Sequence, residues 1–181
     1  MPGASAATIS LVTQADAPAF AGFLARNRAF LQPFEPVRPD AHFTVAGQEA
    51  RIRDAVEESL AGTGFVFAIR ADGDLVGQIG LRNVARGAWQ NATLGYLVGQ
   101  EHNGKGYATR AIALVLRFAF EEARLHRVQA GIMPRNAASR RVLEKNGFRY
   151  EGRSLRYLKI NGVWEDHDMY ALTEEEWRPK G

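Results

Sequence analysis

The stretch VGQEHNGKGYA, residues 98–108, decides how the rest of the sequence is interpreted. It starts at the end of an apolar run, 93–98, that predicts a strand, and it leads into apolar residues that recur at helical spacing from 108 to 119. A glycine-rich turn between a strand and a helix presents unpaired backbone N–H groups and the positive helix end to an anion. Because glycine has no side chain, a phosphate group can approach the backbone closely. The sequence therefore predicts a phosphate-binding turn here.

Two common phosphate-binding motifs fit this turn only in part. A P-loop, Gly-x-x-x-x-Gly-Lys-Ser/Thr, is matched by Gly99 and Lys105, but Gly106 stands where the magnesium-binding hydroxyl must be. A Rossmann fingerprint, Gly-x-Gly-x-x-Gly/Ala, is matched by Gly104 and Gly106, but Thr109 breaks its third position. A glycine-rich helix cap that binds nothing is the remaining alternative.

The turn 103–108 resembles the pyrophosphate loop of the GCN5-related N-acetyltransferases (GNAT family), whose pattern is Gln/Arg-x-x-Gly-x-Gly/Ala. Gly106 and Ala108 satisfy the pattern, whereas Asn103 departs from it. Downstream, NAASRRVLEKNGF at 136–148 resembles the family's Asn-x-x-Ala/Ser-x-x-Leu/Val-Tyr-Glu-Lys-x-Gly-Phe helix. Further segments are similar to the ribosomal-protein-alanine N-acetyltransferases of this family, namely 27–38, 83–87, 126–128, 133–134 and 161–167.

Periodicity alone predicts a mixed α/β domain with a largely antiparallel sheet and one βαβ crossover. Strands are expected at 8–12, 65–70, 75–81, 93–98, 127–133 and on both sides of Asn161-Gly162, and helices at 13–31, 48–60, from 107 on and from 136 to 146. The resemblance implies the GNAT fold, a twisted, mostly antiparallel sheet of about six to seven strands with a central splay and about four flanking helices. We expect one domain over residues 1–181.

The resemblance implies acetyl-CoA as cosubstrate, held in the splay of the sheet. Its pantetheine would pair with the backbone around 97–99 and its pyrophosphate with the amides of 104–108. Between Asn103 and Lys159, 13 Lys/Arg stand against 4 Asp/Glu, an excess that suits the phosphates of CoA. The candidate cofactor-binding residues are Leu97, Val98, Asn103, Gly104, Lys105, Gly106, Tyr107, Ala108, Asn136 and Arg141. Each of the basic side chains could equally be a solvated surface charge, and Asn136 could be simply an N-cap.

The implied reaction moves an acetyl group from the thioester directly to a free amine. Many family members place a Tyr, which protonates the leaving sulfur, where this chain has Leu143. The resemblance makes Ser139 the substitute, although a serine in the first helical turn can also serve the local backbone. Glu35 and Asp166 are the candidate bases, with a surface ion pair and a solvated edge acid as their structural alternatives.

The resemblance also implies the N-terminal α-amine of a protein as acceptor, namely that of an Ala-led ribosomal protein. An α-amine has a pKa of about 7.7–8.0, so a weak base suffices, whereas a lysine amine at about 10.4 needs stronger help. Tyr157 and Trp164 are candidates for lining the peptide channel, unless they pack only against each other across their hairpin.

Composition excludes several other classes of function. Among 181 residues there is no Cys, which removes disulfides and thiolate chemistry, and four scattered His form no local metal cluster. No apolar run is long enough to span a bilayer and no secretory signal is evident, so we expect a cytoplasmic protein. We also expect a monomer or a homodimer, and no metal ion. Few aromatics interleave the arginines, so direct nucleic-acid binding is not expected.

Three alternatives stay open at this point. The chain could be a noncatalytic CoA-binding or regulatory domain, since Leu143 replaces the usual Tyr. It could bind RNA or the ribosome through its basic half. It could also acetylate a small amine, such as an antibiotic, a polyamine or a free amino acid.

Overall fold

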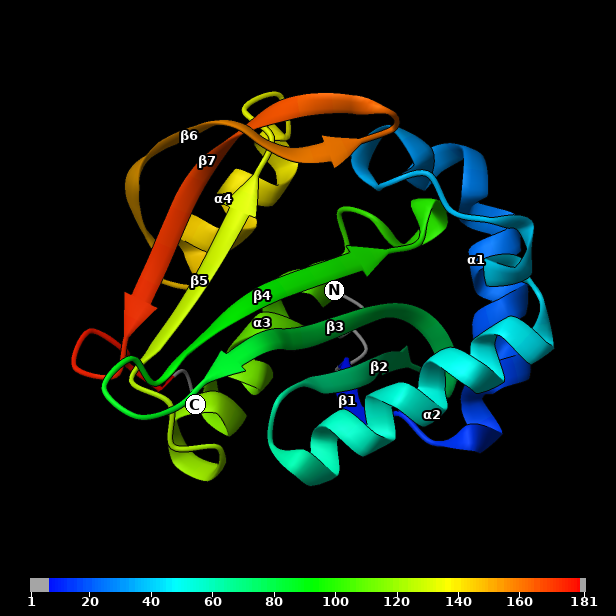
Figure 1. Ribbon diagram of the computed structural model, residues 1–181, viewed down its shortest axis with the longest axis horizontal. Coiled ribbons are helices and arrows are strands. Elements are labelled where there is room, and N and C mark those ends of the chain that lie inside the picture. Colours follow the sequence, from blue (N-terminus) through cyan, green and yellow to red (C-terminus); the bar gives the residue numbers. More distant parts are fainter. Residues whose placement is uncertain (1–6, 180–181) are drawn as a thin grey trace, which may run out of the picture.

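The computed structural model describes residues 7–179 as a seven-stranded sheet with two helices on each face (Figure 1). The sheet order is β1-β2-β3-β4-β5-β7-β6. The strands are β1 Thr8–Leu11, β2 Phe65–Ala71, β3 Asp74–Ala85, β4 Asn91–Val98, β5 Arg127–Ile132, β6 Arg149–Ile160 and β7 Val163–Thr173. The helices are α1 Ala17–Leu31, α2 Val45–Ala61, α3 Tyr107–Arg117 and α4 Ala137–Lys145. None of the described helices is long and apolar enough to cross a membrane.

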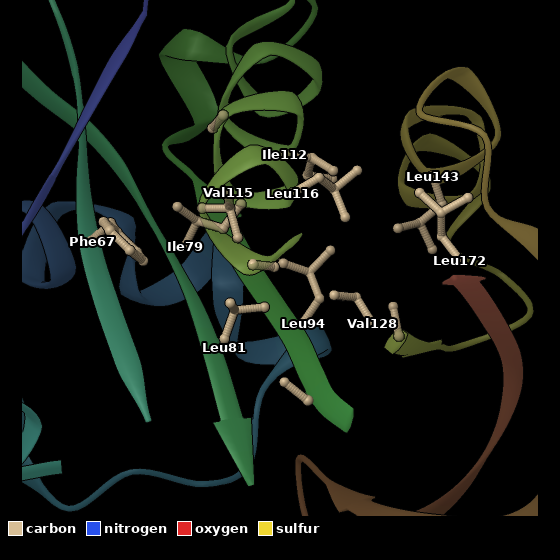
Figure 2. Packing of buried hydrophobic residues seen from close by; sticks show 14 of the residues in the cluster. Phe67, Ile79, Leu81, Leu94, Ile112, Val115, Leu116, Val128, Leu143 and Leu172 are labelled. Carbon is tan, nitrogen blue, oxygen red and sulfur yellow. The ribbon is translucent and has the colours of Figure 1, made fainter. Parts of the chain in front are cut away.

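Side-chain alternation along β2 divides the core into two layers, as the period of two in a strand requires. Phe65, Phe67 and Ile69 pack in the cluster that contains α3 and α4, and Val66 and Ala68 pack in the cluster that contains α1 and α2. Figure 2 shows the first cluster, in which side chains from both halves of the sheet pack together with those of α3.

All neighbouring strands are antiparallel except β4 and β5, which are parallel and are joined by the crossover through α3. Their pairing covers only Asn91–Thr93 against Arg127–Gln129. Beyond Thr93 the two strands diverge, as Figure 1 shows, so that residues 94–98 of β4 have a free edge. The predicted fold, including its central splay, is confirmed.

The structure differs from the sequence-based boundaries in two places. Helix α3 continues into a π-helix at Phe118–Glu122, and β6 starts at Arg149 rather than near Tyr157. Register shifts between Tyr150 and Gly152, and between Ser154 and Leu158, interrupt the pairing of β6 with β7. The irregular spacing hid the first half of this strand from a search for strict alternation.

Candidate active site

The glycine turn and the first turn of α3 form an anion-binding geometry. Gly104 and Gly106 have positive φ values of 75° and 82°, and a Cβ at either position would meet no atom within 4 Å. The first helical N–H groups, those of Tyr107, Ala108 and Thr109, donate to no described residue. These donors lie at the positive end of the helix, where a negatively charged group is stabilised.

A cavity of about 610 Å³ runs from this turn into the splay between β4 and β5. It is lined by the glycine turn, by the free end of β4, by the start of α4 and by the end of α1 with the loop that follows it. Of the predicted cofactor-binding residues, the lining includes Leu97, Val98, Asn103, Gly104, Gly106, Tyr107, Ala108, Asn136 and Arg141. Lys105 lies in the turn but does not line the cavity.

These residues fit the phosphates and the pantetheine arm of acetyl-CoA. The open space above the two glycines leaves room for a diphosphate against the N–H groups, and Arg141 adds a positive charge to the lining. Along β4, backbone groups of Leu97 and Val98 on the free edge can pair with an extended amide-containing chain. The described residues contain no cluster of three or more His, Asp or Glu side chains that could hold a metal ion.

Asn136 and Ser139 are fixed by the start of α4. The Asn136 side chain accepts a hydrogen bond of 3.1 Å from the Ser139 backbone N–H, which is the N-cap interaction that the sequence predicts. This cap directs the first turn of α4 toward the cavity, where both residues contribute to the lining.

The Ser139 hydroxyl has a partner that the sequence analysis missed. The hydroxyl oxygen of Tyr96, on β4, lies 2.5 Å from Ser139 Oγ and 3.3 Å from the Ser139 carbonyl oxygen. Burial raises the pKa of Tyr96 to about 12, against the opposing effect of the bond with Ser139, so the phenol is protonated at neutral pH. Tyr96 also lines the cavity. The pair therefore offers hydroxyl donors at the inner end of the splay.

Leu143, at the position of the family's usual tyrosine, does not reach the cavity. Its side chain is fully buried in the core cluster that also holds Leu172 (Figure 2). The neighbouring Val142 lines the cavity instead. The general-acid role that the family assigns to this position is therefore not available to the residue found there.

Glu35 lies at the other side of the cavity, in the loop after α1. Burial raises the pKa of its carboxyl group above the ordinary value, although Arg38, Arg51 and Arg82 act in the opposite direction. Its backbone carbonyl accepts a 2.9 Å hydrogen bond from the Asn161 N–H at the tip of the β6–β7 hairpin. The loop and the hairpin are thus joined beside the cavity.

Three other predicted site residues lie outside the cavity. The Asp166 carboxylate accepts a 2.9 Å hydrogen bond from the backbone N–H of Arg156, which has a positive φ of 48° at the irregular part of β6. Tyr157 stacks at a tilted angle against His167, with 5.5 Å between ring centroids. Trp164 is 59% exposed near the tip of the hairpin. The structure brings Ser139 and Glu35 to one cavity and leaves Asp166 in a backbone contact.

Many of the positive charges in the basic segment, residues 103–159, are not available to bind phosphate groups. Several of its arginines form ion pairs with acids on β6, β7 and the C-terminal turn, namely Arg127, Arg135, Arg140, Arg149 and Arg153. For example, Arg153 Nε lies 2.7 Å from Oδ1 of the buried Asp168. These arginines therefore pair with carboxylates around the β6–β7 hairpin rather than at the glycine turn.

Comparisons with known proteins agree with this geometry. The family model described as the acetyltransferase (GNAT) domain matches residues 7–149. The probable N-acetyltransferase YjcK of Bacillus subtilis is 44% identical over 159 residues, which cover 87% of this chain and 88% of that protein. The ribosomal protein uS5-alanine N-acetyltransferase of Escherichia coli is 36% identical over 173 residues, covering 94% of this chain and 89% of that protein.

Among solved structures, Mycobacterium smegmatis RimJ in complex with CoA-disulfide superimposes with a TM-score of 0.92 at 35% identity. The match covers 96% of this chain and 84% of the RimJ chain.

Proposed function

The chain belongs to the GNAT acetyltransferase family, and from this premise we propose that it moves the acetyl group of acetyl-CoA to the N-terminal α-amine of a protein. An Ala-led ribosomal protein is the proposed acceptor, supported by the similarity to the Escherichia coli enzyme named for that substrate. One observation carries the proposal. A single cavity joins the unpaired N–H groups of α3 to the Ser139–Tyr96 hydroxyls and to Glu35.

Acetyl-CoA, when bound, supplies a thioester whose carbonyl carbon is attacked by the amine, so that a C–N bond forms and the C–S bond breaks. The N–H groups at the start of α3 would hold the diphosphate, and Arg141 would add a charge-assisted contact. The free edge of β4 would orient the pantetheine arm toward Ser139. We place no metal ion in this reaction.

Glu35 is the proposed base. Its carboxylate would accept the proton that the attacking amine loses as the C–N bond forms. Because the pKa of Glu35 is raised and an α-amine has a pKa of only about 8, the proton transfer is better matched than for an ordinary exposed glutamate.

Ser139 is the proposed donor to the leaving sulfur. Its Oγ–H would form a hydrogen bond to the thiolate as negative charge develops there. Tyr96 is a positioning residue, since a hydroxyl has one proton and two acceptor sites and the Tyr96 phenol can donate to Ser139 Oγ. That arrangement leaves the Ser139 proton free to point into the cavity.

Thiol release and mass spectrometry test this function directly. We expect the protein and acetyl-CoA to acetylate the α-amine of an Ala-led peptide, with less turnover on Ser- and Met-led peptides and on small amines. Turnover on an antibiotic, a polyamine or a free amino acid alone would assign the acceptor to small molecules. Tight CoA binding without thiol release on any acceptor would identify a noncatalytic CoA-binding domain.

A further inference from the structure

The positive charges of three arginines act on Glu35, which lines the cavity, although none of the three arginines is part of that lining. Arg38 comes from the loop after α1, Arg51 from α2 and Arg82 from β3. All three charges act on the Glu35 carboxyl group, and the charges of Arg38 and Arg82 also act on Arg51. The Glu35 carboxyl group therefore lies in the electrostatic field of three guanidinium groups.

Arg51 is held in place by neutral groups. Its Nε donates to Gln48 Oε1 at 3.0 Å, and its Nη2 donates to Gln78 Oε1. Both glutamines are buried, and the guanidinium lies over the Phe20 ring at 5.9 Å from its centroid. The amide oxygens of the two glutamines accept hydrogen bonds from the Arg51 guanidinium but do not neutralise its positive charge.

Within residues 7–179, none of the three guanidiniums lies within 4.0 Å of a carboxylate oxygen. Burial, together with the charges of Arg82 and Arg38, lowers the pKa of Arg51 to about 10. Burial, together with the charges of Arg38 and Arg51, lowers the pKa of His42 to about 4, so the His42 imidazole is neutral at pH 7. An added anion would relieve the repulsion among the guanidiniums.

The sheet between Gln78 and Arg82 is open at one position, Gly95. Gly80 and Gly95 face each other between the pairs Gln78–Leu97 and Arg82–Thr93, so all three pairs belong to one face of the sheet. A Cβ at Gly95 would meet nothing within 4 Å, and this residue is exposed. Since Arg51 bonds Gln78 on the same face, Arg51 and Arg82 border the exposed Gly95, whereas Gly80 is buried and a Cβ there would meet the Phe65 carbonyl oxygen at 2.9 Å.

We infer that Arg38, Arg51 and Arg82 bind a carboxylate of the acceptor, an acidic side chain within the first few residues after its amine. The inference rests on the proposed function and specifies the substrate of the same site. Glu35 would receive the amine proton while the guanidiniums hold the carboxylate farther along the acceptor. An extended peptide advances about 3.4 Å per residue, so an acid at the second to fourth position is within reach.

The test uses matched Ala-led peptides that carry Asp or Asn at position 2, 3 or 4. Two quantities are measured for each peptide, kcat/KM for acetylation and Kd for the protein saturated with CoA. We expect Asp to be favoured over Asn by about tenfold or more at one position, as for other hydrogen bonds between charged groups. Free alanine and alaninamide are measured in parallel.

Variants assign the preference to the arginines. Arg82→Gln should abolish the preference for Asp, and Arg51→Gln should do the same if that variant remains folded. Arg82 is exposed and forms no hydrogen bond with another described side chain, so we expect its substitution to leave the fold intact. Arg53→Gln is the control, because Arg53 is an exposed residue of the same helix as Arg51; it should keep the full preference.

Equal kcat/KM and equal Kd for Asp and Asn peptides at every position would overturn the inference and leave the proposed function standing. So would a preference that survives Arg82→Gln. If no peptide is acetylated, the proposed function fails, and the Kd values still test the carboxylate site separately. A preference for free alanine over alaninamide, with no difference between Asp and Asn peptides, would overturn the inference as well and would assign the acceptor to small molecules.

Discussion

At the scale of single residues, the hydroxyls of Tyr96 and Ser139 lie 2.5 Å apart at the inner end of the cavity. The phenol is protonated, and the serine backbone is fixed by its N-cap partner Asn136. Neither hydroxyl needs to change its charge to donate a hydrogen bond. Such fixed donors contribute most where charge appears only during the reaction.

Replacing Ser139 with Ala should lower kcat by about tenfold or more, ~1.4 kcal/mol of barrier, and should change the Kd for CoA little. Tyr96→Phe should have a smaller effect in the same direction. If Tyr96 acts through Ser139, the double variant should be no slower than Ser139→Ala. Steady-state kinetics and calorimetry check this. Wild-type kcat in Ser139→Ala would remove the serine from the mechanism.

The start of α4 makes Asn136 predictable as an N-cap from local residues, whereas Ser139 is a candidate only through the family resemblance. Sequence reasoning missed Tyr96 because this residue reads as one position in an alternating strand, and nothing in the sequence shows that its neighbour across the splay is a serine 43 residues later. Asp166 was favoured because it is a carboxylate near a predicted hairpin, but the irregular β6 backbone that it contacts has no sequence signal.

The raised pKa of Glu35 predicts a specific pH dependence. Only the carboxylate can accept a proton, so kcat at saturating acceptor should fall as the pH drops through the pKa of Glu35, at a higher pH than for an ordinary glutamate. Glu35→Gln should lower kcat and remove this acidic limb. The exposed Glu49 on α2 provides the control, and Glu49→Gln should keep the wild-type profile. An unchanged acidic limb in Glu35→Gln would contradict the assignment.

At the scale of elements, the turn before α3 was the most predictable part of the molecule. Glycines at positive φ and a helix start are both local properties, so the sequence alone indicates the anion-binding N–H groups. The divergence of β4 from β5 is different. It depends on pairing between distant segments, and only the family resemblance implied it.

Gly106→Ala tests the turn. The new Cβ has open space in the protein, so it would meet only the bound diphosphate, and CoA affinity should fall by about tenfold or more. Gly73→Ala is the matched control, because Gly73 has a similar φ of 87° and equally open space but lies in the β2–β3 turn, outside the lining of the cavity. Both variants should lose about 1–2 kcal/mol of stability. Calorimetry with CoA distinguishes them, and equal affinities would contradict the proposed turn.

At the scale of the whole molecule, one buried cluster spans the splay. It includes Ile79 from β3, Leu94 from β4, Val128 from β5, Leu172 from β7 and Leu143 from α4 (Figure 2). The two halves of the sheet therefore share a core even where their strands are not hydrogen-bonded. This supports the proposal of a single domain.

A shared core predicts one cooperative thermal transition. Saturation with CoA at about 100 times its Kd should add about 2.7 kcal/mol to the free energy of unfolding, because only the folded protein has the cavity. Leu143→Ala should lower the midpoint, since a fully buried leucine typically contributes about 2–5 kcal/mol. Differential scanning calorimetry measures the number of transitions, the stabilisation by CoA and the midpoint of Leu143→Ala. Two separate transitions would contradict a single domain.

The most direct test is a comparison of CoA with pantetheine by isothermal titration calorimetry on the wild-type protein. Pantetheine keeps the thiol and the arm but lacks the diphosphate together with the adenosine 3′-phosphate that it carries. If the N–H groups at the start of α3 hold that diphosphate, CoA should bind at a single site and pantetheine about a hundredfold or more weaker. Equal affinities, or no heat with CoA, would contradict the account.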